Sequence, residues 1–228
     1  MQSFQKWKSV CPDSWFSCQP NKNGFLPVDQ PLQRLPEQFD VINSILDEMK
    51  ISQHGYLERG KMANVIETRL PLFDFSDITN VQLLAALLRD YCFMASAYSL
   101  EPCHISLMKS KKGVYGVARN SLPENLAAPL QVLAEKNNTF PWLDYAHGYG
   151  LNNAVLKEKE MDPTKYDSYH TVRTFNGNKS EEGFINVHVA MVAQSGKLLH
   201  YQQECLENIA KDERILFNEN LQNHFLIF

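Results

Sequence analysis

Apolar residues recur at helical spacing along most of the chain, and this pattern predicts a mainly α-helical fold. Strand-like alternation is scarce, so at most a short β-hairpin is expected, within residues 102–123. The predicted helices run from about Phe39 to Met49, Asp77 (capped by Ser76 or by Asp77 itself) to Leu100, Leu126 to Glu135, Pro141 to Glu158, Glu181 to beyond Leu199, and Asp212 to the end.

The helix that begins near Glu181 carries the most informative stripe. Glu181 and Glu182 lie in its first turn, where carboxylates favour the positive end of the helix dipole. His188 lies on the stripe and has two interpretations: a core histidine that hydrogen-bonds a neighbour, or a polar group directed into an apolar pocket. The residues predicted to face the core are Phe184, Val187, His188, Met191, Val192, Ser195, Leu198 and Leu199.

Two glycines interrupt the helix predicted between residues 141 and 158. Gly148 and Gly150 each cost a helix about 1 kcal/mol relative to alanine. Either something bulky passes close to the backbone here, or two helices pack tightly against each other.

Composition narrows the classes of function. The chain has 228 residues, of which 44% are hydrophobic, enough for one large domain or two small ones. A net charge of −4 and scattered lysines and arginines argue against a nucleic-acid partner. Five cysteines without a CxxC pair argue against a zinc site or disulfide framework, and no apolar run approaches the ~20 residues of a membrane span. We therefore expect a cytoplasmic protein without a membrane partner.

Several short motifs occur in a fixed order along the chain. Taken together they resemble the indoleamine 2,3-dioxygenase family, and order and spacing agree over roughly residues 24–210. The motifs are GFLP (24–27) followed by Leu35-Pro36, LPENLAAP (122–129), PWLDYA (141–146), and RTFNG (173–177) followed by Gly183-Phe184.

This resemblance implies a two-domain helical haem dioxygenase fold. It divides the chain into an irregular leader (1–23), a small domain on the distal side of the haem (24–160), a connector (161–180) and the first helices of a large haem domain (181–228). The implied reaction inserts O2, the co-substrate, across the indole C2–C3 bond of L-tryptophan or a related indoleamine and gives N-formylkynurenine. Haem b would perform that chemistry, while the protein supplies a dry pocket and orientation.

The resemblance also assigns pocket residues. His188 matches a pocket position and is the candidate catalytic residue, because it could accept a hydrogen bond from the indole N–H. Phe184 matches the aromatic residue that packs on the indole, and Ile185 departs from a second aromatic position. The candidate distal-pocket residues are Tyr145, Gly148, Tyr149, Gly183, Phe184 and Ile185.

The same resemblance places the proximal histidine that binds the iron beyond residue 228. None of the seven histidines matches that position, so no metal ligand is expected in this chain. The apolar ending Phe225–Phe228 favours an incomplete large domain, with the missing C-terminal region or a second chain as the expected partner. The alternative is a haem-free helical interaction module derived from the family, without enzyme activity.

Overall fold

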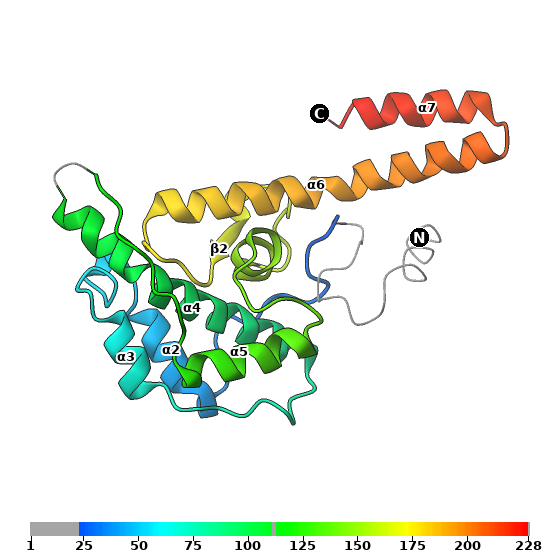
Figure 1. The fold of residues 1–228 in the computed structure, drawn as a ribbon. Helices are drawn as coiled ribbons and strands as arrows, with labels where there is room; N and C mark the ends of the chain where they lie inside the picture. Colours follow the sequence, from blue (N-terminus) through cyan, green and yellow to red (C-terminus); the bar gives the residue numbers. More distant parts are fainter. Residues whose placement is uncertain (1–22, 111–112, 228) are drawn as a thin grey trace.

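The computed structural model describes residues 23–110 and 113–227, and nearly all of the predicted leader lies outside them. The fold is mainly α-helical, as predicted (Figure 1). The longer helices are α2 (Asp40–Asp47), α3 (Met62–Arg69), α4 (Val81–Lys109), α5 (Glu124–Lys136), α6 (Lys179–Ala210) and α7 (Arg214–Phe225). Short helical turns are η1 (Glu37–Phe39), η2 (Ile51–Gln53), η3 (Tyr145–Gly150), η4 (Leu151–Asn153) and η5 (Tyr166–Ser168), and two strands are β1 (Ala154–Leu156) and β2 (Tyr169–Thr171).

Helix α4 is the centre of the first core, and α2, α3 and α5 pack around it. Its middle is buried on nearly all sides. It begins later than predicted, because the side chain of Asn80, and not Ser76 or Asp77, accepts the capping hydrogen bond from the Leu83 amide. It also continues through Pro102 to Lys109, and residues 113–123 contain no strand, so the predicted hairpin is wrong within the described part of that region.

The helix predicted between residues 141 and 158 is also wrong. A single π-helical turn, η3, forms instead and leads through η4 into β1. β1 pairs antiparallel with β2, with Val155 opposite His170. The reason is a polar side chain: the Asn153 amide donates hydrogen bonds to the carbonyls of Tyr149 and Arg173, which turns the chain away from a helical path.

A cluster of buried charges ties this region to the first core. Arg173 donates to both carboxylate oxygens of Asp90 in α4 and to Asp47 in α2. Arg89 donates to Asp90 from its own helix, and to the Asn152 carbonyl. The connector is therefore held against α4 and α2 by charge-assisted hydrogen bonds.

Helix α6 lies across this body, and its far end extends beyond it, where α7 runs back alongside (Figure 1). The predicted buried stripe of α6 is wrong, since Phe184, Val187 and Met191 are all exposed. Smaller residues pack against the body because they allow a close approach of the helix. The buried face consists of Ile185, Asn186, Val189, Ala190, Ala193 and Gly196.

The predicted final helix is present as α7, and none of its residues is buried. The turn between α6 and α7 contains Asp212, whose φ of 59° lies in the left-handed region. Within residues 23–110 and 113–227, no helix is long and apolar enough to cross a bilayer.

Candidate functional site

Three ring side chains from two separate segments meet on the outer face of α6. The His188 ring lies edge-on to the Tyr145 ring, with centroids 4.9 Å apart. Phe184, one turn earlier in α6, makes a second edge contact with Tyr145 at 5.9 Å. Such edge-to-face pairs are a favoured aromatic geometry, so the contacts give the cluster a defined shape.

The π-helical turn η3 carries Tyr145, and the preceding residue, Asp144, caps the backbone of this turn. The Asp144 carboxylate accepts hydrogen bonds from the amides of His147 at 2.6 Å and Gly148 at 3.0 Å. Burial lowers the pKa of His147, and Arg89 adds to this effect while Asp144 opposes it. π-Helical turns occur often at functional sites, which makes this segment a candidate on geometry alone.

Gly150 shows why glycine is needed here. A Cβ atom at this position would lie 3.3 Å from the Tyr145 carbonyl and 3.6 Å from Cδ2 of His188. The tight contact is with the backbone of η3 itself, whereas the distance to His188 of α6 is ordinary van der Waals contact, so the geometry of the π-helical turn accounts for this glycine.

The outer face of α6 carries apolar side chains, whereas the solvent-facing side of a helix normally carries charged ones. Phe184 is 56% exposed and Met191 65%, and Val187 between them is also exposed. No Asp, Glu, Lys or Arg occurs from residue 183 to residue 196. A helix of a water-exposed surface usually carries charges on its outer face, so this stretch has the character of a surface that contacts an apolar group.

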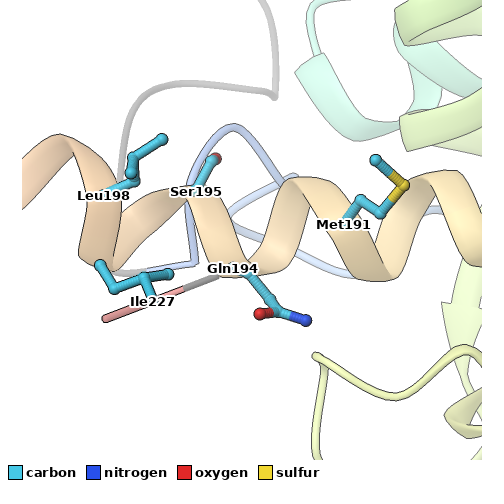
Figure 2. A pocket seen from close by; sticks show the side chains of 5 residues that line it. All are labelled: Met191, Gln194, Ser195, Leu198 and Ile227. Atoms are coloured by element: carbon cyan, nitrogen blue, oxygen red, sulfur yellow. The ribbon is translucent and has the colours of Figure 1, made fainter. Parts of the chain in front are cut away.

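The same face continues into a cavity of about 260 Å3 (Figure 2). Met191, Ser195 and Leu198 come from successive turns of α6, and Ile227 on the segment after α7 also lines the cavity. The lining is predominantly apolar in kind and is completed by Gln194. The aromatic cluster and this cavity thus form one continuous apolar strip along α6.

The other predicted pocket residues are placed differently. Tyr149 lies between Tyr145 and α4. Its ring stacks with Phe93 of α4, and its hydroxyl donates a hydrogen bond to Glu181 at 3.1 Å. Gly148 is buried within η3, and Ile185 is buried in the second core, on the side of α6 that faces the body. A Cβ at Gly183 would contact nothing within 4 Å, so this glycine leaves the first turn of α6 open.

Val187, Met191 and Glu181 were not predicted as site residues. Val187 and Met191 were assigned to the core, although the absence of charge over residues 183–196 signals two apolar faces on one helix. Glu181 was attributed to the helix dipole alone, and nothing in the local sequence shows which segment its carboxylate contacts.

Comparison with known proteins identifies the family. The family model for indoleamine 2,3-dioxygenase matches residues 16–225, which is nearly the whole chain. The chain belongs to the indoleamine 2,3-dioxygenase family. This is a family of haem-dependent dioxygenases. A search of curated proteins found no match to this chain.

The strip on α6 fits one face of the haem that indoleamine 2,3-dioxygenases use. It combines exposed apolar side chains, Phe184, Val187 and Met191, with two ring groups, Tyr145 and His188, that carry polar atoms. A flat apolar macrocycle buries its surface favourably against such a strip. Among the described residues, no group of three or more His, Cys, Asp or Glu side chains gathers to hold a metal ion.

Proposed function

We propose that this chain forms the distal side of a haem dioxygenase site that acts on L-tryptophan or a related indoleamine. Residues 24–160 would form the small distal-side domain, 161–180 the connector and 181–228 the first helices of the large domain. The observation that carries the proposal is the uncharged, exposed strip of α6 beside the Tyr145 ring. The family match supports the reaction class.

The bound haem would supply the oxygen chemistry that incorporates both atoms of O2 across the indole C2–C3 bond and gives N-formylkynurenine. This chain's residues would bind and orient the substrate. Phe184 would pack on the indole ring, and the ring of Tyr145 would limit how far the indole can move. Val187 and Met191 would exclude water from the apolar strip.

His188 has the polar atoms needed to orient the indole. Its ring is held edge-on to Tyr145 and is partly exposed on the strip. In its neutral form one ring nitrogen accepts a hydrogen bond. We propose that this nitrogen accepts the indole N–H. Gly183 would keep the first turn of α6 open for the substrate.

The cysteines that the structure describes suit reducing conditions. Cys92, Cys103 and Cys205 are all free thiols, and burial raises the pKa of the Cys92 thiol to about 12, with Asp144 adding to the effect. A thiol protonated at neutral pH is a weak nucleophile, so Cys92 is a packing residue. We propose a cytoplasmic location on this basis.

The test is an absorbance titration of the purified chain with haemin, followed by a kynurenine assay with L-tryptophan and O2. We expect a Soret band that depends on the strip, so that Met191→Glu reduces haemin uptake while Leu206→Glu, at a similarly exposed apolar position far along α6, does not. Equal uptake by both variants would show nonspecific haemin adsorption. No uptake by the folded chain, alone or with a C-terminal segment or second chain that carries the proximal histidine, would favour the haem-free interaction module.

A further inference from the structure

The side chain of Glu181 joins three parts of the site. Its carboxylate accepts a hydrogen bond from the Tyr149 hydroxyl at 3.1 Å. It also accepts from the backbone amides of Phe175 at 2.8 Å, Asn176 at 2.7 Å and Gly177 at 3.1 Å. An ionised carboxylate has about four acceptor positions, and here four donors from two other segments use them.

A glutamate in the first turn of a helix normally contributes through the helix dipole, but Glu181 does more than that. The N-terminus of α6 already has its cap, because the Asn178 side chain accepts from the Glu181 amide at 2.9 Å. The Glu181 carboxylate instead reaches back to the connector and across to η3. Glu182, its neighbour in the same turn, makes no side-chain hydrogen bond within residues 23–110 and 113–227.

Helical spacing places Glu181 in line with the candidate site. Phe184 and His188 follow it at i+3 and i+7, so all three lie along one face of α6. On the other side, Tyr149 follows Tyr145 at i+4 in η3, and their ring centroids are 6.1 Å apart. The Glu181–Tyr149 hydrogen bond therefore joins the two segments whose rings, Tyr145 and His188, meet two turns further along α6.

We propose that Glu181 is a positioning residue that sets the placement of Tyr145 relative to His188. Its meaning for catalysis rests on the function proposed above, whereas the geometry can be tested without haem. The charged acceptor makes the four hydrogen bonds stronger than neutral ones. Removing the charge while keeping the shape should loosen η3 and the connector from α6 together.

The experiment is NMR spectroscopy of the full chain, in which the Tyr145 ring current marks the carbon-bound protons of the His188 ring. Tyr145→Leu supplies the reference shift without that ring. In Glu181→Gln we expect the His188 resonances to move at least halfway to this reference. We also expect the amides of residues 175–177 to exchange about tenfold faster. Glu182→Gln removes the same charge from the same turn and should change neither quantity.

Tyr149→Phe is the second variant, because it removes one donor and keeps the ring. It should reproduce part of the His188 shift and leave the amides of residues 175–177 protected. If Glu181→Gln lowers the melting temperature while the His188 resonances stay in place, Glu181 stabilises only the helix terminus and the proposal fails. Because these measurements need no haem, that result would leave the haemin titration as a separate test of the proposed function.

Discussion

The charge cluster around Asp90 and the outer face of α6 are opposites: the first buries charged side chains, and the second exposes apolar ones to solvent. Asp90 and Arg89 have fully buried side chains, and Arg173 is 4% exposed. On α6, Phe184 and Met191 lie mostly in solvent. The buried charges are paired with one another within the chain. The apolar side chains on the outer face of α6 are exposed to solvent instead of being covered by other parts of the chain. The first region is satisfied within the chain except for Nη2 of Arg89, which has no hydrogen-bond partner among the described residues, and the second is built for contact with another group.

Asp90→Ala should give the largest effect on stability, because it removes the buried carboxylate that Arg89 and Arg173 share and leaves Arg173 only the half-exposed Asp47. We expect the free energy of unfolding to fall by about 3–5 kcal/mol, measured by urea denaturation. Arg34→Ala breaks the exposed pairs with Asp40 and Asp47 and serves as the control, with little change expected. Equal losses in the two variants would contradict the assignment of the buried cluster as the anchor.

The same cluster predicts a pH dependence. Burial acts to raise the pKa of Asp90, but the nearby charges of Arg89 and Arg173 outweigh it and hold the pKa below its ordinary value of 3.8. A carboxyl with a lowered folded-state pKa contributes stability above the unfolded value. This contribution should be lost as pH falls below 3.8 through the folded pKa. In acid titrations the wild type should lose more stability than Asp90→Asn, which lacks this carboxyl.

Two phenylalanine-to-alanine substitutions compare the buried core around α4 with the exposed outer face of α6. Phe93 is fully buried and stacks with Phe175 at 4.7 Å, so Phe93→Ala should cost about 3–5 kcal/mol of unfolding free energy. Phe184→Ala should cost less than about 1 kcal/mol, since the ring is mostly exposed already. It should nevertheless weaken haemin or indole binding. Denaturation and binding titrations of both variants separate the two roles, and a large stability loss in Phe184→Ala would show that this ring belongs to the core.

His188→Ala tests whether the polar atom on the strip recognises the indole N–H. In an active full-length protein, kcat/KM for L-tryptophan should fall about three- to tenfold more than for 1-methyltryptophan, which lacks that N–H. His200→Ala, at an exposed position on the same helix, is the control and should leave the ratio unchanged. Equal losses on both substrates would make His188 a packing residue.

Tyr91→Phe should have the smallest effect. The buried hydroxyl of Tyr91 has no hydrogen-bond partner among the described residues, and burial raises its pKa. Removing it should leave the unfolding free energy unchanged or raise it by up to about 1 kcal/mol. Tyr98→Phe removes a hydroxyl that donates to Glu67 at 2.7 Å and should instead lower it by about 0.5–1.5 kcal/mol. Thermal denaturation of the two variants is the measurement, and a clear destabilisation by Tyr91→Phe would reveal a partner for that hydroxyl.

The sequence predicted the helices with long apolar repeats and missed the segment between residues 141 and 158. Helix α5 and helix α6 carry apolar residues at helical spacing, and their starts were located within about two residues. The π-helical turn η3 is capped locally by Asp144, but its exit into β1 depends on Asn153, which donates a hydrogen bond to the carbonyl of Arg173 in the connector. Such contacts have no period, so no pattern along the chain indicates them.

The candidate site was predicted only in part, because its geometry also depends on contacts between distant segments. The motif resemblance indicated Tyr145, Phe184 and His188, and the structure brings these three rings together. The face of α6 that packs against the body was not predicted correctly, because residues 183–196 form two apolar faces and helical periodicity does not show which one is buried.

The amino-acid sequence by itself determined the helical class, the family motifs and the uncharged stretch of α6 at residues 183–196. Tertiary structure decided which face of α6 packs on the body and where the Glu181 carboxylate lies. The face with Val189, Ala190, Ala193 and Gly196 is buried because small and β-branched side chains let two backbones approach closely. The larger side chains of Phe184 and Met191 are left outside. That choice depends on the shape of the surface beneath the helix, which many distant residues build together.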